Sequence, residues 1–168
     1  MKRIYLIGMP GSGKSTSGKR FAKSMGWGYA DLDKLVMIRA QKPISAIFEE
    51  DGEQKFRELE QFTLHETAES TRLVVGCGGG TAAWFNNIDW MLAHGMVIWL
   101  NIPEHELLKR LQRSKTARPL FPTREPNDLL QRMRTLYAAR KPFFERASLT
   151  VSSEMELLAL VPYLKALH

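Results

Sequence analysis

The sequence predicts a three-layer α/β/α fold, in which helices cover both faces of a five-stranded parallel sheet. Short apolar runs of strand length alternate along the chain with segments whose apolar residues recur at helical spacing. Continuous apolar runs suit parallel strands that are buried on both faces. With 168 residues, of which 44% are hydrophobic, the chain is long enough for one domain with a substantial core. We therefore expect residues 1–168 to form a single domain.

The expected elements follow one another as strands and helices. The five expected strands cover residues 4–7, 29–30, 73–75, 96–100 and 149–151. The expected helices cover residues 15–25, 32–40, 44–50, 53–70, 87–93, 104–113, 127–144 and 154–167. Residues 114–126 interrupt the alternation, because they join two helices without a strand between them. This segment holds three prolines and the basic residues Lys115, Arg118 and Arg124, a composition that predicts a mobile lid.

The first strand leads directly into the motif G-x-x-x-x-G-K-S at residues 8–15. Glycines let the backbone wrap around phosphate oxygens, Lys14 reaches the outer phosphates, and the Ser15 hydroxyl is placed to bind magnesium. A Gly/Ser turn that merely contains a lysine would lack the strand before the motif and the amphipathic helix after it. The sequence therefore predicts a site for a nucleoside triphosphate, with contacts from Gly11, Ser12, Gly13, Lys14, Ser15 and Thr16.

Two carboxylates, Asp31 and Asp33, follow the second strand. Ligands of open α/β folds bind at this carboxyl edge of the sheet. Phosphoryl transfer needs such groups to hold the magnesium shell and to orient the attacking hydroxyl. Alternatively, one aspartate caps the next helix. The phosphate loop upstream favours the functional interpretation.

Residues 52–60 read G-E-Q-K-F-R-E-L-E and place Arg57 and Glu60 three residues apart on one helical face. Such a face is usually solvated, and an exposed pair of this kind contributes only about 0.2–0.5 kcal/mol. Taken alone, this segment predicts no site.

Three consecutive glycines, Gly78, Gly79 and Gly80, follow the third strand. Each glycine costs roughly 0.5–1 kcal/mol in backbone entropy relative to alanine, so three together are unusual in a simple connection. They predict a close approach of the backbone to a ligand, whereas a plain turn is the alternative.

The net charge and the cysteine content restrict the possible binding partners and the cellular compartment of the protein. A net charge of +6 and a pI near 9.6 fit either nucleic-acid binding or the attraction of small anions. The basic residues are interleaved with leucine and methionine at helical spacing, which favours small anions. The single cysteine excludes an internal disulfide framework, and the histidines lack the spacing of metal ligands. No segment resembles a signal peptide or a membrane span. We expect a cytoplasmic protein.

Taken together, the motifs resemble the shikimate kinase family over nearly the whole chain. The resemblance rests on the phosphate loop, the D-x-D at 31–33, the G-E-x-x-F-R-x-x-E at 52–60, the triple glycine at 78–80, the R-P-L at 118–120 and the R-x-P at 140–142 followed by aromatic residues. It implies a kinase related to the nucleoside monophosphate kinases that transfers the γ-phosphoryl group of ATP to the 3-hydroxyl of shikimate. It further implies a monomer that uses Mg²⁺ and binds neither nucleic acid nor membrane.

The resemblance also implies a role for each matching residue. Lys14 and Arg118 would neutralise the migrating phosphoryl group, and Asp33 would orient or deprotonate the attacking hydroxyl. Ser15 and, through water, Asp31 would hold magnesium. The substrate would be bound by Asp33, Arg57, Gly78, Gly79, Gly80 and Arg140, with the two arginines on its carboxylate, and the nucleotide by Arg113, Arg118 and Ser152 in addition to the phosphate loop.

The chain departs from the family pattern in three places. Cys77 stands where a small hydroxyl residue is common, Phe144 replaces a common tyrosine, and residues 151–154 lack the usual aspartate of the adenine loop. Adenine contacts there must come from the backbone or from a serine.

Two other functions compete with this interpretation. A gluconate or nucleoside kinase would share the sheet, but Arg57 together with the triple glycine favours a carboxylated cyclic polyol. A nucleotide-regulated nucleic-acid binder or a catalytically silent relative is the alternative from another class. Loss of Lys14, Asp33 or Arg118 would mark a silent form, and all three residues are present.

Overall fold

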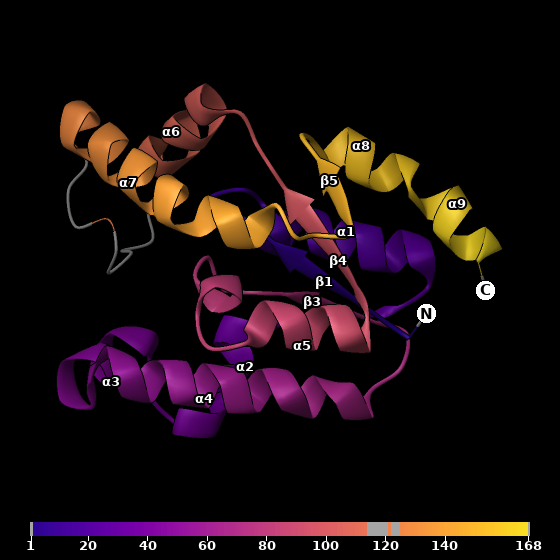
Figure 1. Cartoon of the computed structure of the whole chain (residues 1–168), viewed down its shortest axis with the longest axis horizontal. Coiled ribbons are helices and arrows are strands. Elements are labelled where there is room, and N and C mark those ends of the chain that lie inside the picture. The colour runs from indigo at the N-terminus through magenta and orange to yellow at the C-terminus, as the bar shows by residue number, and fades with distance from the viewer. Residues whose placement is uncertain (1, 114–120, 122–124, 168) are drawn as a thin grey trace.

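The structure is a computed structural model that describes residues 2–113, 121 and 125–167. These residues form a parallel five-stranded sheet of order β2-β3-β1-β4-β5 (Figure 1). The strands are β1 (Arg3–Ile7), β2 (Gly28–Asp31), β3 (Leu73–Gly76), β4 (Met96–Leu100) and β5 (Leu149–Val151). The predicted α/β class and all five predicted strands are confirmed.

Helices connect the strands and cover the sheet. They are α1 (Lys14–Met25), α2 (Leu32–Ala40), α3 (Ile44–Glu50), α4 (Gly52–Glu66), α5 (Asn87–His94), α6 (Glu104–Arg113), α7 (Pro126–Phe144), α8 (Glu154–Ala159) and α9 (Val161–Ala166). Two short 3₁₀ helices, η1 (Thr67–Glu69) and η2 (Thr81–Ala83), follow α4 and the glycine turn at residues 78–80.

The central strand β1 is buried on both faces because its side chains alternate between two cores. Ile4 and Leu6 pack with apolar residues of α1, α8 and α9, whereas Tyr5 and Ile7 pack with α4, α5, α6 and α7. All four side chains have no exposed surface. This two-sided burial explains why the strand reads as an unbroken apolar run.

Tyr29 of β2 fixes how closely α1 approaches the sheet. A Cβ atom on Gly18 of α1 would lie 2.7 Å from Tyr29 Cε2, and one on Gly76 of β3 would lie 2.2 Å from its hydroxyl oxygen. Both glycines therefore leave room for the tyrosine ring. The phosphate loop, which precedes α1, gains its place over the sheet from this packing.

Helices α2, α3 and α4 form a smaller unit beside the sheet (Figure 1). Val36, Ile47 and Phe56, one from each helix, make a separate apolar cluster. This unit carries Asp33, Arg57 and Glu60 on α2 and α4.

Arg3 joins three chain segments at the amino end of the sheet. Its Nη1 donates to the carbonyl oxygens of Ala68 (2.5 Å) and Ser70 (2.6 Å), and its Nε donates to that of His94 (3.1 Å). The side chain is buried. The segments that follow α4 and end α5 are thereby fixed to the start of β1.

Two predicted helices differ from those observed. The helix expected at 154–167 is two helices, because Pro162 lies in the first turn of α9 and lacks the N–H that a continuous helix would use. The helix expected at 53–70 ends at Glu66, and residues 67–69 continue as η1, where the Thr67 hydroxyl donates to the Leu64 carbonyl at 2.6 Å. Within the predicted lid, Phe121 is buried in the core and Pro126 begins α7; residues 114–120 and 122–124, Arg118 included, lie outside the described residues.

Candidate active site

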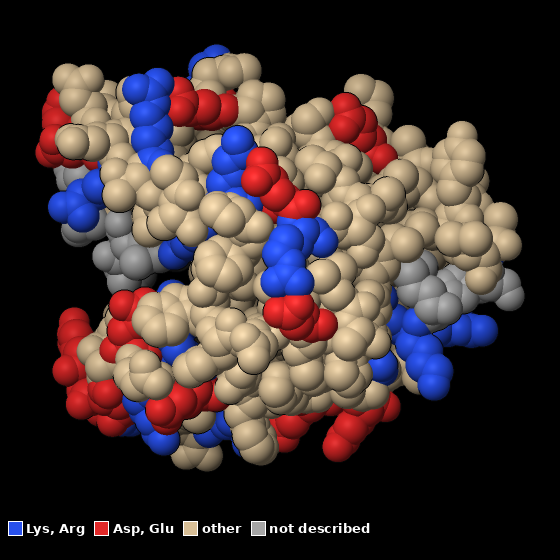
Figure 2. All heavy atoms as spheres, in the orientation of Figure 1, with Lys and Arg blue, Asp and Glu red and all other residues tan. Residues whose placement is uncertain are grey.

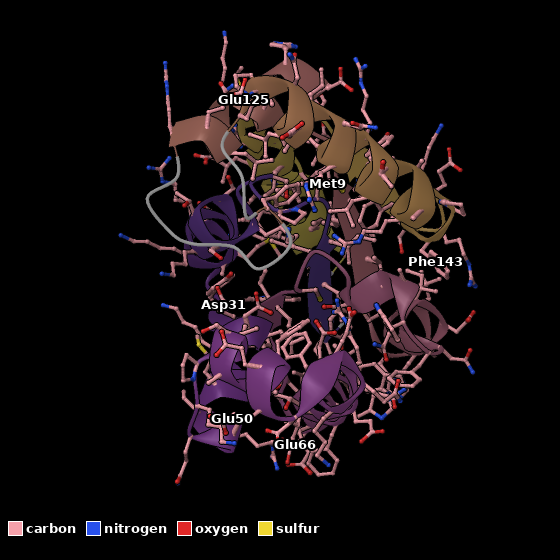
Figure 3. The ribbon with its side chains drawn as sticks, turned by 90° about the vertical axis from the view of Figure 1, so that its left-hand side faces the viewer. Met9, Asp31, Glu50, Glu66, Glu125 and Phe143 are labelled. Atoms are coloured by element: carbon pink, nitrogen blue, oxygen red, sulfur yellow. The ribbon has the colours of Figure 1, made fainter. Side chains whose placement is uncertain are left out.

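The phosphate loop is folded ready for anions. Gly11 and Gly13 have φ of 84° and 92°, a left-handed conformation that L side chains rarely adopt. Lys14 is buried, and its ammonium donates to the carbonyl oxygens of Gly8 (2.8 Å) and Met9 (2.9 Å) and to the Ser12 hydroxyl (3.3 Å). These acceptors hold the ammonium group inside the loop. Figure 3 looks toward Met9 in this loop and Asp31 at the end of β2.

Asp31 caps α2 and also lies beside the Ser15 hydroxyl. Its Oδ1 accepts a hydrogen bond from the Lys34 backbone N–H at 3.3 Å, so it caps α2. Its Oδ2 accepts from the Ser15 hydroxyl at 2.8 Å. A hydroxyl and a carboxylate side by side are hard oxygen donors of the kind that Mg²⁺ prefers, so these residues fit a magnesium ion.

Asp33, in the first turn of α2, lies among other carboxylates. Its pKa is raised to about 6, first by burial and then by the negative charges of Glu60 and Asp31, which outweigh the lowering by Lys14 and Arg57. At neutral pH this carboxylate is ionised and is a better proton acceptor than an exposed aspartate.

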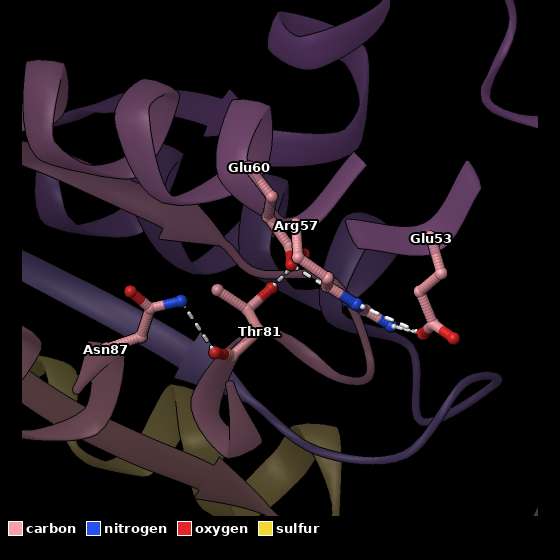
Figure 4. Close-up of polar contacts among 5 residues, drawn as sticks. All are labelled: Glu53, Arg57, Glu60, Thr81 and Asn87. Carbon is pink, nitrogen blue, oxygen red and sulfur yellow. Dashed lines mark hydrogen bonds and ion pairs between the residues drawn. The ribbon is translucent and has the colours of Figure 1, made fainter. Parts of the chain in front are cut away.

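Arg57 of α4 is held by two carboxylates on its own helix (Figure 4). Its Nη1 donates to Glu60 Oε2 at 2.8 Å, and its Nε and Nη2 donate to Glu53 Oε1 at 3.3 and 3.2 Å. The Arg57 side chain is 3% exposed and that of Glu60 is fully buried. The guanidinium also lies over the rings of Phe56 and Trp84, at 5.0 and 5.2 Å from their centroids.

The glycine turn lies against these side chains. A Cβ atom on Gly80 would lie 2.8 Å from Arg57 Nη2, and one on Gly79 would lie 2.7 Å from the ring of Pro10 in the phosphate loop. A Cβ atom on Gly78 would lie 2.7 Å from Glu60 Oε1 and 2.9 Å from Asp33 Oδ1. The turn thus lies against side chains of the candidate site, and its predicted close approach to a ligand stays a prediction.

Arg140 of α7 brings a second buried guanidinium to the same region. Burial first, and the positive charge of Arg57 next, lower its pKa to about 10. Its Nη1 is buried and has no hydrogen-bond partner among the described residues. Two buried like charges near each other, one with an open donor, favour an anion between them.

The nucleotide side of the site is less complete. Arg113 ends α6 and is exposed. The Ser152 hydroxyl and backbone N–H donate to the carboxylate of Glu156 at 2.8 and 2.7 Å. Arg110, which the sequence reading passed over, donates from Nη1 to the Ser12 carbonyl oxygen at 3.1 Å and so lies against the phosphate loop.

Two of the three departures from the family pattern, Cys77 and Phe144, are core residues. Cys77 is buried, with its sulfur 3.7 Å from that of Met91, and burial raises the pKa of its thiol. Phe144 is buried and packs against Trp99 with ring centroids 5.6 Å apart.

Sequence reasoning missed the roles of Glu53, Glu60 and Thr81. The spacing of Arg57 and Glu60 was visible, but a charged helix face gives no sign of burial. Glu60 is buried because Thr81, from the other side of the site, donates to its Oε1 at 2.5 Å. The G-E-x-x-F-R-x-x-E pattern was the only available signal.

The described part of the chain contains no group of three or more His, Cys, Asp or Glu residues that could hold a metal ion by themselves. None of its helices is long and apolar enough to span a bilayer.

Comparisons with known proteins agree with this geometry. The family model for shikimate kinase matches residues 10–161. The shikimate kinase of Parabacteroides distasonis is 39% identical over 157 residues, which cover 94% of this chain and 91% of that protein. A crystal structure of shikimate kinase from Bacteroides thetaiotaomicron superposes with a TM-score of 0.90 at 32% identity, covering 99% of this chain and 97% of that one.

A shikimate kinase from Acinetobacter baumannii in complex with shikimate gives a TM-score of 0.85 at 31% identity, covering 99% and 92% of the two chains. A gluconokinase from Sinorhizobium meliloti gives a TM-score of 0.61 at 19% identity over 98% of this chain and 91% of that one, a likeness that shows the fold alone.

Proposed function

This chain belongs to the shikimate kinase family, and from that membership we propose how its own residues carry out the transfer of the γ-phosphoryl group of ATP to the 3-hydroxyl of shikimate. The observation that carries the proposal is the pair of buried guanidinium groups, Arg57 and Arg140, beside the ionisable Asp33. A substrate with a carboxylate and a ring hydroxyl satisfies both features at once. Gluconate also has a carboxylate, but the gluconokinase likeness extends to the fold only.

The two arginines bind and orient the substrate. Arg140 offers an unpartnered Nη1, and Arg57 is held in place by Glu53 and Glu60. A planar carboxylate accepts paired N–H donors from guanidinium groups, which fixes its orientation as well as its position. The backbone of Gly80 lies beside Arg57 and that of Gly79 beside Pro10, and both would contact the substrate ring.

Asp33 takes the proton of the attacking hydroxyl. The oxygen–hydrogen bond of the 3-hydroxyl breaks, that oxygen bonds to the γ-phosphorus, and the bond from phosphorus to the β-γ bridging oxygen breaks to release ADP. A carboxylate whose pKa lies near 6 accepts this proton more readily than an ordinary aspartate does. Lys14, with Arg118, stabilises the charge on the transferred group.

Ser15 and, through water, Asp31 would hold Mg²⁺. The ion supplies charge neutralisation for the β- and γ-phosphates when bound. On binding ATP, the Lys14 ammonium exchanges the carbonyl oxygens of Gly8 and Met9 for phosphate oxygens.

We further propose that the protein acts as a cytoplasmic monomer on small molecules, with neither nucleic acid nor membrane as partner. An assay that couples ADP release to a spectrophotometric signal tests the function. ADP should form only when shikimate is present, and not with gluconate or nucleoside monophosphates. Equal turnover with gluconate, or ADP formation without an acceptor, would contradict the proposal, and gel filtration checks the monomer.

A further inference from the structure

Thr81 connects the glycine turn to the clamp through both its side chain and its backbone (Figure 4). It is fully buried, and its hydroxyl donates to Glu60 Oε1 at 2.5 Å. Its carbonyl oxygen accepts from Asn87 Nδ2 at 2.9 Å, and its N–H donates to the Gly78 carbonyl oxygen at 3.3 Å. The residue directly after the three glycines is therefore held from three sides.

The two carboxylate oxygens of Glu60 accept hydrogen bonds from different elements, one from Thr81 after the turn and one from Arg57 of α4. Oε1 accepts from Thr81 and Oε2 accepts from Arg57. A fully buried carboxylate is stable only where its oxygens are hydrogen-bonded and its charge is paired. Removal of the Thr81 donor leaves Oε1 without that bond, and the carboxylate can then rotate and take the guanidinium with it.

The turn has little freedom to move independently of these groups. A Cβ atom on Gly78 would lie 2.7 Å from Glu60 Oε1 and 3.0 Å from the Thr81 hydroxyl oxygen. One on Gly80 would lie 2.8 Å from Arg57 Nη2. The side chains therefore approach the turn so closely that a larger residue at either position would clash with them.

Asn87, at the start of α5, holds the other end of the connection. Its side chain is fully buried, and the bond from Nδ2 to the Thr81 carbonyl oxygen uses its amide donor. Its Oδ1 is buried with no partner among the described residues. The Asn87 side chain thus leaves its buried Oδ1 without a partner in the described part of the chain while its Nδ2 binds the Thr81 carbonyl oxygen. An arrangement with such a cost indicates that the position of this carbonyl group is important.

We propose that Thr81 is a positioning residue for substrate recognition, which, with Asn87, ties the glycine turn to the Glu60–Arg57 pair so that the turn and the arginine meet the substrate as one preformed surface. Thr81 does not touch the substrate in this proposal. It acts through Glu60 on Arg57 and through its own backbone on Gly80. The inference rests on the proposed function, because it assumes that Arg57 and the turn bind shikimate.

Steady-state kinetics of Thr81→Val test it, since valine keeps the branched shape and replaces the hydroxyl by a methyl group that cannot donate. We expect the KM for shikimate to rise about tenfold, as for loss of one hydrogen bond to a charged group, while the KM for ATP stays within about twofold. Thr81→Ser should restore the wild-type KM. Thr63→Val is the matched control, because Thr63 is a buried threonine of α4 whose hydroxyl donates only to the Leu59 carbonyl oxygen, at 2.7 Å.

Asn87→Ala is a second test, because it removes the hydrogen bond from Asn87 Nδ2 to the Thr81 carbonyl oxygen. This variant should also raise the KM for shikimate and leave the KM for ATP unchanged. A Thr81→Val protein with a lower melting temperature and an unchanged KM for shikimate would overturn the inference, as would equal changes in both KM values. If the wild-type protein released no ADP with shikimate, the proposed function itself would fail. Should Thr81→Val not fold, Asn87→Ala decides: an unchanged KM for shikimate in that variant would overturn the proposal.

Discussion

At the scale of single residues, the two clamp arginines are predicted to differ. Arg57→Ala and Arg140→Met should each weaken shikimate binding about 10-fold to 100-fold and leave ATP binding unchanged, because each removes a charge-assisted contact. Arg57→Ala should also lower the melting temperature clearly, since it leaves Glu60 buried without its cation. Arg140 has an open donor, so its loss should affect stability less.

Calorimetric titration and thermal unfolding of both variants check this difference. Arg39→Ala is the control, because Arg39 pairs with Glu66 on the exposed side of the same unit. Normal shikimate affinity in Arg140→Met would remove Arg140 from the clamp.

The titration of Asp33 should set the fall of kcat/KM at acid pH. Its pKa is raised to about 6 by burial first and by Glu60 next, and only the ionised form accepts a proton. We expect kcat/KM to fall tenfold per pH unit below about pH 6. Asp33→Asn should cut kcat by roughly 10²–10⁴ and leave nucleotide affinity intact.

The same pKa predicts a stability effect with a definite sign. Because the folded-state pKa of Asp33 lies above the ordinary value, the folded protein favours the protonated form, and this stabilisation is lost as the pH rises through about 6. Asparagine carries no charge at any pH. Asp33→Asn should therefore unfold at a higher temperature than the wild type at pH 8, and the difference should vanish near pH 4. A lower melting temperature at pH 8 would contradict the assigned burial of the charge.

At the scale of elements, the packing of β2, β3 and α1 around Tyr29 is predicted to tolerate no side chain at position 76. Gly76→Ala should destabilise the fold by about 1–3 kcal/mol, because its Cβ would lie 2.2 Å from the Tyr29 hydroxyl oxygen. Tyr29→Phe removes that oxygen, and the next ring atom would be 3.2 Å from the new Cβ. The double variant should recover much of the loss.

Urea unfolding of the two single variants and the double variant measures this coupling. Gly28→Ala is the control in the same strand β2, because its nearest neighbour, Leu73 Cδ1, would lie at an ordinary 3.4 Å. Additive losses would mean that the two positions do not share the space.

Elements with a local signal could be predicted from the sequence, and contacts between elements could not. The run before the phosphate loop and the alternation of strands and helices are local patterns, and all five strands were found. The burial of Glu60 depends on Thr81, which is 21 residues away in sequence and arrives from another element. Likewise, Gly76 is explained by Tyr29, and Gly18 by Tyr29 together with Leu6, which come from other elements. The break between α8 and α9 did have a local signal, Pro162, which was overlooked.

At the scale of the whole molecule, the charge of +6 is predicted to serve small anions. On the face shown in Figure 2, basic and acidic side chains are intermixed, and acidic ones gather over α3 and the start of α4. Binding to duplex or single-stranded DNA should be no tighter than the non-specific range of about 10⁻⁴–10⁻⁶ M at physiological salt. Fluorescence anisotropy with labelled oligonucleotides checks this, and submicromolar, sequence-dependent binding would restore the nucleic-acid interpretation.

The hydrogen bonds that Arg3 makes to Ala68, Ser70 and His94 hold the carboxyl end of α4 in place. This helix has 15 residues and is therefore about 22 Å long, with its carboxyl end next to the Arg3 attachment and with Glu53 and Arg57 near its amino end. A tilt of about 5° around the attached end would move the other end by about 2 Å. We therefore predict that α4 tilts about its carboxyl end, which Arg3 holds.

Hydrogen exchange can reveal such a tilt. Amides in the last turn of α4 should exchange equally slowly with and without shikimate, whereas those near Arg57 should slow when shikimate binds. Uniform slowing along the helix would mean that it does not tilt about that end. If α4 tilts in this way, Arg3, which is remote from the substrate-binding residues, affects how firmly Arg57 is held in place, and Arg3→Met should change the affinity for shikimate.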